Sequence, residues 1–450
     1  MLSYWRLHKY PILFVIGSVL FYASFAYDLV RTDFLKLFML FAALFFLCHK
    51  IMQFEKWNFN FLLVTGILFR LVFLVAEPNL SQDFFRFIWD GELIKNGINP
   101  YLHTPDQLME QGNVPIANAD ELYAGMSELN AKHYSNYPPV NQLFFALAAL
   151  LGGGSILGSI IVMRLTIILA DLGILYFGRK LLKNLNHADH MAFWYLLNPL
   201  VIIELTGNLH FEGIMLFFFV WSLYLISKKQ WLWAAPVYAV SIMVKLVPLL
   251  LLPMFLKYLG IKKSVIFYGV VGISSALMLY PFYSSFFIDH YSETVGLWFS
   301  NFEFNASVYN VVKKIAVEHY EAKPWELIEA YGSMIIKAML VVVLLIALLR
   351  KNQKLQTVIS SMVLALACYY FLSSTVHPWY VVFLLGIAIF TEYRFVLVWS
   401  FAVILSYYAY TDPDYTENLW LLAVEYILVI GFFLYEMMAK GPKKLYFFKK

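Results

Sequence analysis

The stretch SQDFFRFIWDGELIKNGINPY (Ser81–Tyr101) follows an apolar segment and opens the longest polar interval in the first half of the chain. If it is helical, Asp83 and Asp90 share one face, because residues three or four apart are neighbours on a helix. Arg86 lies within reach of both carboxylates. Gly97 then predicts the end of the helix. The pattern predicts a helix at a bilayer interface, whose charges either face water or take part in chemistry.

The composition, 61% hydrophobic and 14% charged, is far from that of soluble proteins. It indicates a membrane protein with many helices. Cys48 and Cys368 both lie in apolar segments, so neither a disulfide framework nor a cysteine metal site is expected. The net charge of +4 is small and no long basic patch is present, which argues against nucleic acid as a partner.

The apolar segments predict an all-α polytopic membrane protein with roughly 12–14 transmembrane helices. They lie near residues 10–30, 34–53, 59–76, 155–178, 188–205, 208–226, 231–258, 262–281, 333–350, 355–374, 378–391, 394–410 and 418–438. The segment 231–258 contains three prolines and Lys245, and is expected to form two short helices in a hairpin with Lys245 at its tip. The run 139–151 is too short to span a bilayer.

Lysine and arginine gather in alternate loops, and acidic residues gather in the others. This alternation predicts that both termini are cytoplasmic and that the long loops 77–154 and 282–332 are extracytoplasmic, each with interfacial helices. A surface helix is expected at Pro324–Gly332, and the first apolar run is expected to be an uncleaved anchor. The expected regions are 1–58, N-terminal helices; 59–281, a core; 282–332, the second outer loop; and 333–450, C-terminal helices with a basic cytoplasmic tail.

Ionisable groups near the outer helix ends are candidates for substrate binding, because such groups are costly at membrane depth. Glu204, His210 and Glu212 lie in one tight turn that offers too few ligands for a metal, so hydrogen bonding to a sugar and a structural turn are the two alternatives. The other candidates for substrate binding are Arg86, Asp90, Lys245, Glu303, Asn305, His377 and Tyr380. Arg70, Arg164 and Asp171 lie within apolar segments and are instead expected to hold the bundle together through internal pairs.

An outer cavity with an acid, basic groups and aromatic surface suits glycosyl transfer from a lipid phosphate. The leaving phosphate needs positive charge, whereas the acceptor hydroxyl needs a base. Asp83 is the expected general base for an in-line, inverting attack, with Lys245 and His377 stabilising the leaving group. A transporter or flippase would use the same features, although its site should lie near the membrane midplane. A non-catalytic scaffold of the cell envelope is a further alternative.

Five motifs carry a resemblance to a known family: SQDFFRFIWDGELIKNGINPY, YPPVNQLFFALAALLG, LNPLVIIELTGNLHFEG, VKLVPLLLLP and STVHPWYVVFLL. Together they resemble the bacterial GT-C superfamily of mannosyltransferase-like membrane glycosyltransferases over most of residues 60–400. The resemblance implies a GT-C-like bundle, an inverting reaction and a polyprenyl-phosphate-linked sugar donor, often of mannose. The acceptor would be a lipid, glycan or protein, and the site would face the extracytoplasmic side of the bacterial inner membrane.

Within this resemblance, Asp83 matches the acidic residue of the first outer loop. Phe84 follows it where some members have a second carboxylate. A single aspartate is a poor site for a divalent cation, so no metal or other cofactor is expected. The first two helices are additional to the usual core of the family.

Overall fold

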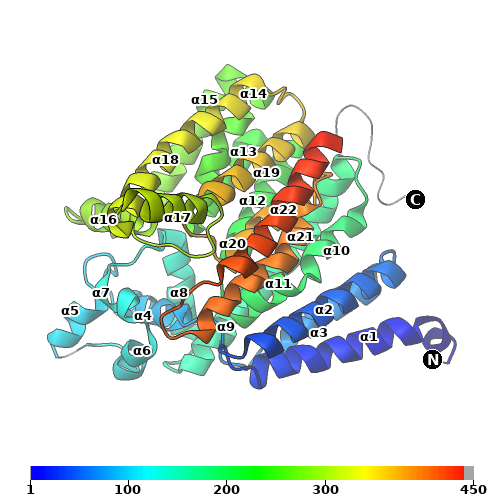
Figure 1. The fold of residues 1–450 in the computed structure, drawn as a ribbon, viewed down its shortest axis with the longest axis horizontal. Coiled ribbons are helices and arrows are strands. Elements are labelled where there is room, and N and C mark those ends of the chain that lie inside the picture. Colours follow the sequence, from blue (N-terminus) through cyan, green and yellow to red (C-terminus); the bar gives the residue numbers. More distant parts are fainter. Residues whose placement is uncertain (1, 113, 440–450) are drawn as a thin grey trace.

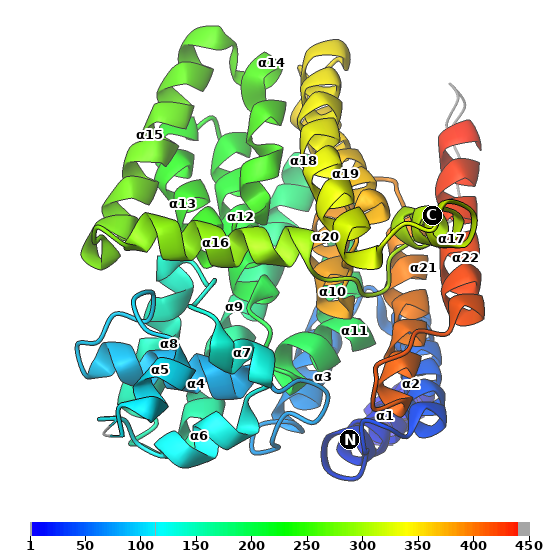
Figure 2. The same cartoon turned by 60° about the vertical axis from the view of Figure 1, so that its left-hand side comes forward.

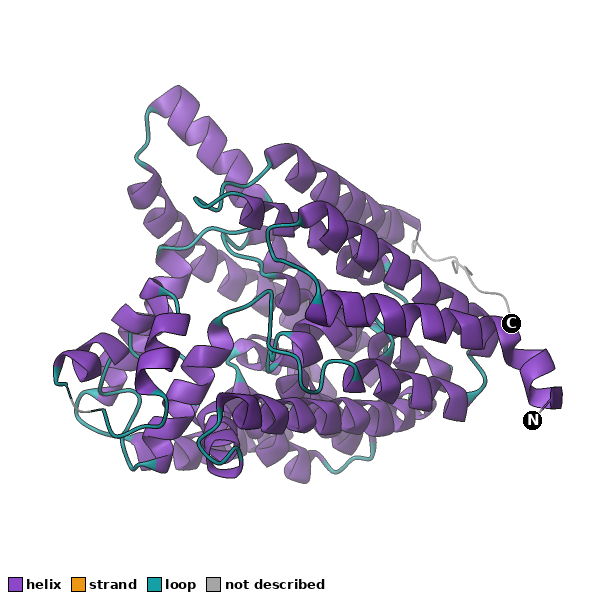
Figure 3. Cartoon of the chain, turned by 90° about the horizontal axis from the view of Figure 1, so that it is seen from below, coloured by secondary structure: helices purple, strands orange, loops and turns teal. Residues whose placement is uncertain are grey.

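The computed structural model describes residues 2–112 and 114–439. The chain is built from helices, and the described residues contain no strand beyond one isolated bridge between Phe304 and Thr375 (Figures 1 and 3). The predicted fold class, an all-α polytopic membrane protein, is confirmed.

The first helices are α1 (Leu2–Tyr27), α2 (Phe34–Glu55), α3 (Phe59–Leu71), α4 (Asp83–Lys95), α5 (Pro105–Glu110), α6 (Ala119–Gly125), α7 (Glu128–Lys132), α8 (Pro139–Leu151) and α9 (Ile156–Asn184). The middle of the chain forms η1 (Asp189–Ala192), α10 (Phe193–Leu196), α11 (Pro199–Val201), the π-helix η2 (Ile202–Gly207), α12 (Glu212–Ser227), α13 (Trp231–Val244), η3 (Val247–Phe255), α14 (Leu256–Leu259) and α15 (Ile261–Leu279). The last elements are η4 (Tyr280–Phe282), α16 (Phe287–Ser300), α17 (Val308–Tyr320), α18 (Pro324–Leu349), α19 (Leu355–Leu372), α20 (Pro378–Ala388), α21 (Phe395–Ala402), η5 (Val403–Thr411) and α22 (Leu419–Ala439).

Seven helices within the described residues are long and apolar enough to cross a membrane. These are α1, α2, α9, α15, α18, α19 and α22. Other apolar segments form six shorter helices of 10–17 residues, and the segment from α11 to α12 is bent by 115°. Of the predicted segments, several are therefore short or broken helices rather than straight spans.

Two predicted boundaries are wrong. The segment 188–205 is not one helix, because Pro199 lacks an N–H and Asn198 caps a new helix by accepting a hydrogen bond from the Leu200 N–H at 2.9 Å. The predicted surface helix Pro324–Gly332 has no end of its own, since α18 continues without a break to Leu349.

The predicted break at Lys245 is confirmed. Helix α13 ends at Val244, and the 3-10 helix η3 begins at Val247. The Tyr238 hydroxyl donates a hydrogen bond to the Pro248 carbonyl at 2.7 Å, so the two helices lie side by side at the break.

The short helices of the first long loop gather at one end of the bundle (Figure 1). Helix α16 lies across the ends of α15 and α18 that face these short helices (Figure 2). The start of α1 and the end of α22 point toward the opposite end (Figure 1). The short helices of the first long loop and α16 thus lie on one side of the molecule.

Buried arginines fix the helices beneath this end. Arg70 on α3 pairs with Asp171 on α9, with Nε 2.8 Å from Oδ2, and both side chains are fully buried. Arg164 on α9 donates hydrogen bonds to four carbonyl oxygens, those of Leu74, Ala76, Thr206 and Gly207. The predicted structural role of these ions is confirmed, although Arg164 meets backbone rather than a carboxylate.

Candidate functional site

Helix α4 carries the predicted base at its first residue. Its C-terminal end is set by Gly97, whose φ of +75° favours glycine. The helix packs directly against α8, because Gly91 leaves room for the backbone of Phe145: a Cβ on Gly91 would lie 2.3 Å from the Phe145 oxygen. Most of α4 is buried, so its side chains pack against other parts of the protein rather than lying free on the surface.

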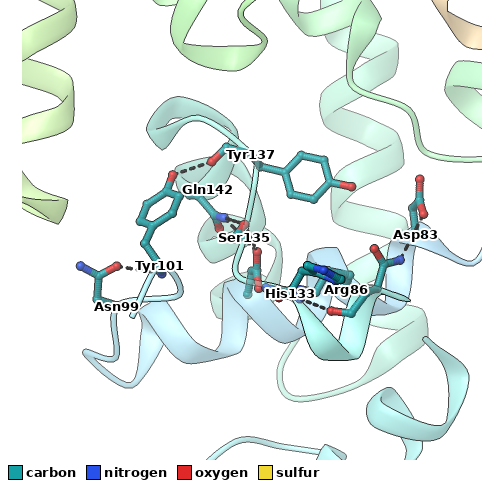
Figure 4. Close-up of polar contacts among 10 residues, drawn as sticks. Asp83, Arg86, Asn99, Tyr101, His133, Ser135, Tyr137 and Gln142 are labelled. Carbon is teal, nitrogen blue, oxygen red and sulfur yellow. Dashed lines mark hydrogen bonds and ion pairs between the residues drawn. The ribbon is translucent and has the colours of Figure 1, made fainter. Parts of the chain in front are cut away.

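Arg86 and Asp90 belong to a closed polar network (Figure 4). Asp90 is fully buried and accepts hydrogen bonds from Arg86 Nε at 2.7 Å, Ser135 Oγ at 2.6 Å and Gln142 Nε2 at 2.9 Å. Arg86 also donates to the His133 carbonyl at 2.9 Å. Both side chains therefore hold the first long loop against α4 and α8, and Asp90 is poorly placed to receive a proton from a substrate.

Asp83 lies apart from that network, as Figure 4 shows. Its side chain is partly buried, and Oδ1 accepts a hydrogen bond from Asn130 Nδ2 at 3.5 Å. None of the described residues donates to Oδ2. Burial raises the pKa of Asp83, while the Asn130 hydrogen bond and the charges of Lys245 and Arg31 lower it. Asp83 thus presents one carboxylate oxygen that is free to accept a proton.

Lys245 and Glu212 form an ion pair near Asp83. The charges of both residues act on the Asp83 carboxyl. Glu212 begins α12 and is buried, whereas Lys245 retains 29% side-chain exposure. The Lys245 ammonium also lies 5.0 Å from the centre of the Tyr380 ring. Three of the predicted substrate-binding residues therefore meet at one point.

Glu204 lies on the π-helix η2, in the bend that precedes α12. It is fully buried, and its two oxygens accept hydrogen bonds from the Tyr407 hydroxyl at 2.6 Å and Asn208 Nδ2 at 3.3 Å. His210 Nε2 lies 3.7 Å from Glu204 Oε2. No group of three or more His, Cys, Asp or Glu side chains in the part of the chain that the structure describes is placed to hold a metal ion.

Four rings stack beside the Lys245 pair. Trp379 lies between His210 and His377, with ring centres 3.8 and 4.3 Å away, and Phe304 covers His377 at 4.9 Å. Burial, with the charges of Lys245 and Arg31, lowers the pKa of His377 to about 3. Its Nδ1 is buried without a hydrogen-bond partner. His377 is therefore a neutral hydrogen-bonding group at neutral pH.

The remaining two candidates are held by other parts of the chain. Glu303 forms an ion pair with Lys313 on α17. The Asn305 side chain donates to Glu425 on α22 at 3.1 Å and to the Val376 carbonyl at 3.3 Å. The structure does not bring either side chain into contact with Asp83, Lys245 or His377.

The sequence reasoning missed Arg31, Asn130, Trp379 and Tyr407. Arg31 could have been found from the sequence. It is a basic residue in the loop between α1 and α2, and the charge alternation assigns that loop to the set that carries acidic residues. Trp379 follows His377 by two residues in an aromatic motif. Asn130 and Tyr407 reach the site only through the folding of distant segments.

Comparison with known proteins gives the family. Residues 18–260 match a family described as "Alpha-(1->6)-mannopyranosyltransferase, N-terminal domain". Alpha-(1->6)-mannopyranosyltransferase A of Mycobacterium tuberculosis is 23% identical over 152 residues, 34% of this chain and 28% of that protein. Alpha-(1->6)-mannopyranosyltransferase B of Corynebacterium glutamicum is 24% identical over 146 residues, 32% of this chain and 23% of that protein.

The matched stretch spans about a quarter of the length of these relatives. The family match itself covers more than half of the 450 residues, including α4, η2 and Lys245. The resemblance to mannosyltransferase-like membrane proteins is thereby confirmed. The chain belongs to the family described as "Alpha-(1->6)-mannopyranosyltransferase, N-terminal domain".

Proposed function

We propose that this protein transfers a sugar, with mannose favoured, from a polyprenyl-phosphate donor to a hydroxyl of an extracytoplasmic acceptor, with inversion. The observation that carries the proposal is the free carboxylate oxygen of Asp83 beside Lys245, in a chain whose relatives are named mannopyranosyltransferases. The acceptor is a lipid, glycan or protein, and the membrane is the bacterial inner membrane.

In the proposed reaction the acceptor oxygen attacks the anomeric carbon of the sugar. The bond between that carbon and the phosphate oxygen breaks, and the polyprenyl phosphate leaves with the electron pair. Asp83 takes the proton of the acceptor hydroxyl as the new bond forms. Preorganised positive charge and hydrogen-bond donors lower the energy of the departing phosphate. Because attack and departure occur on opposite faces of the sugar, the configuration inverts.

Lys245 and His377 are assigned to the donor phosphate. Glu212 fixes the Lys245 ammonium, and the ring stack fixes the neutral His377. We expect Lys245→Met and His377→Ala each to weaken donor binding about tenfold or more, because each removes a polar contact to an anion. Titration of the purified variants with a polyprenyl-phosphate sugar measures this.

The matched control for this prediction is Lys257→Met. Lys257 donates to the Arg350 carbonyl at 3.2 Å, between α14 and the end of α18, remote from this cluster. Its loss should leave the affinity for the donor unchanged. Wild-type affinity in both the Lys245 and the His377 variant would rule out the assignment.

Glu204, His210 and Tyr380 are assigned to hydroxyl groups of the sugar. They surround the same aromatic surface, on which a sugar ring packs well. Arg86 and Asp90 act on the substrate only by holding the loop that carries Asn130. Glu303 and Asn305 have no role in this proposal.

A transporter is the second candidate, and one observation favours it. The bend of 115° between η2 and α12 resembles the discontinuous helices with which transporters bind substrate. A transporter moves its substrate unchanged, whereas a transferase consumes it. The two functions are therefore separated by product analysis.

The proposal requires the first long loop to be extracytoplasmic. In a variant without Cys48 and Cys368, cysteines introduced at the exposed residues Gln111 and Glu318 should react with an impermeant reagent in intact cells. A cysteine at Lys351, in the loop between α18 and α19, should react only after lysis. The opposite pattern would invert the topology.

The direct test is a panel of polyprenyl-phosphate sugars incubated with the purified protein and candidate acceptors. We expect the mannose-linked donor to be consumed with release of polyprenyl phosphate. A panel in which no sugar is lost would contradict the proposed function.

A further inference from the structure

A cleft of about 440 Å³ opens beside the start of α4. It lies between the loop joining α1 and α2 and the segment joining α3 and α4. Its wall includes the apolar residues Leu29, Val30, Phe84 and Phe85 and the charged residues Arg31 and Glu77. Gln82, which precedes Asp83, also lines it. The volume of the cleft is within the range of ligand sites. Its wall has both apolar and polar parts, which suits an amphipathic ligand.

Arg31 is the cation of this cleft. Its guanidinium lies 3.4 Å from the centre of the Tyr410 ring, a cation–π contact that fixes its position. No ion pair of the described residues involves Arg31, and its Nε is buried without a hydrogen-bond partner. A buried donor without a partner in the protein is available to an acceptor that enters the cleft. Arg31 is thus a positioned cation whose charge is available.

Aromatic contacts connect Arg31 to the candidate site. The Tyr410 ring lies 5.7 Å from Phe304, which stacks on His377. The charge of Arg31 also acts on two groups there: it lowers the pKa of Asp83 and of His377. Arg31, which lines the cleft, therefore lies close to the candidate site, on the side of the first two helices.

The charges of the proposed reaction favour a second cation near Asp83. As the proposed base, Asp83 carries a negative charge before transfer, and Glu212 forms an ion pair with Lys245. A phosphate-linked donor adds a negative charge, and the departing phosphate acquires another. Before transfer, the negative groups are Asp83, Glu212 and the donor phosphate, and Lys245 alone would oppose them. Arg31 adds a second positive charge. Glu77 is exposed to water, which screens its repulsion.

We propose that this cleft binds the lipid phosphate of the donor, with Arg31 on the phosphate and the Leu29–Val30 and Phe84–Phe85 walls on the first isoprene units. The inference rests on the proposed function, because the ligand is that reaction's donor and product. The proposal gives the first two helices a part in the site. Lys245 is already paired with Glu212, and the loop between α1 and α2 supplies Arg31 as the additional cation.

Farnesyl phosphate tests the phosphate contact in the detergent-solubilised full chain, with farnesol and inorganic phosphate as separate probes. Arg31→Gln should weaken farnesyl phosphate binding about tenfold or more and leave farnesol binding unchanged. Arg31→Lys should restore part of the affinity, and it also replaces Arg31→Gln if that variant misfolds. Lys36→Gln is the matched control, since Lys36 lies on the same hairpin but pairs with the exposed Asp28. Equal affinity of wild type and Arg31→Gln for farnesyl phosphate would overturn the proposal.

Val30→Trp tests the apolar wall without changing the charge. Val30 is 64% exposed, so the larger ring should fit the fold and fill the cleft. Both farnesyl phosphate and farnesol should then bind more weakly, whereas Leu35→Trp, 71% exposed on α2, should change neither. Wild-type binding of both probes by Val30→Trp would remove the cleft as the site of the lipid.

The two proposals fail differently in these experiments. Binding of farnesyl phosphate that depends on Arg31, without any sugar transfer by the wild type, supports the cleft and contradicts the transferase. Sugar transfer that is unchanged in Arg31→Gln supports the transferase and contradicts the cleft.

Discussion

Replacement of Asp83 by Asn is expected to reduce turnover at least about a hundredfold while leaving donor binding intact, because a general base contributes at least that factor. The amide has nearly the shape of the carboxylate and keeps an oxygen for the Asn130 hydrogen bond, but it accepts no proton. Turnover and donor affinity, measured on the same purified samples, check this.

Asp90→Asn is the comparison for this prediction. Asp90 accepts three hydrogen bonds inside the protein, so its loss should lower stability more than the turnover of the folded fraction. An active Asp83→Asn beside an inactive, folded Asp90→Asn would reverse the two roles. Activity in both variants would remove this loop from the chemistry.

If Asp83 is the general base, the direction in which turnover changes with pH can be predicted. Burial raises the pKa of Asp83, so the base is lost at a higher pH than for an ordinary aspartate. Turnover should therefore fall as the pH drops through that raised pKa. In Arg31→Gln the fall should begin at a still higher pH, since Arg31 lowers the pKa of Asp83.

Replacement of Arg164 by Leu is expected to abolish turnover and to lower the Tm in detergent by about 5 °C or more. Arg164 is fully buried and holds two segments together by their carbonyl oxygens. One segment, Leu74–Ala76, leads to α4, and the other, Thr206–Gly207, ends the π-helix that carries Glu204. Its loss leaves buried carbonyl oxygens without donors and frees both sides of the site.

Arg179→Leu is the control on the same helix. Arg179 pairs with Asp189 at 2.6 Å, and both side chains are partly exposed, so this variant should cost little. A folded Arg164→Leu with full turnover would show that these carbonyl contacts do not position the site.

The sequence predicts what depends on local pattern. The stop at Gly97 and the break at Lys245 follow from glycine and proline chemistry, and both occur in the structure. The buried roles of Arg70 and Asp171 follow from the cost of charge in an apolar segment.

What the sequence does not predict depends on distant segments. Arg31 and Tyr410 come from opposite ends of the chain, and their contact decides the position of the cation. The burial of α4 depends on α8, which the first loop folds back upon it. Neutral His377 is equally a product of burial rather than of its own motif. Neither hydrophobic periodicity nor the charges of the loops predicts the Arg31–Tyr410 contact, the burial of α4 or the neutral state of His377.

The most direct test is reconstitution of the purified protein into vesicles that contain polyprenyl-phosphate mannose labelled at the anomeric carbon and an acceptor. The account predicts loss of the phosphate-linked sugar, an equal amount of mannoside of inverted configuration, and neither change with Asp83→Asn. Labelled donor that crosses the bilayer with its sugar still attached, in wild type and Asp83→Asn alike, would contradict the account.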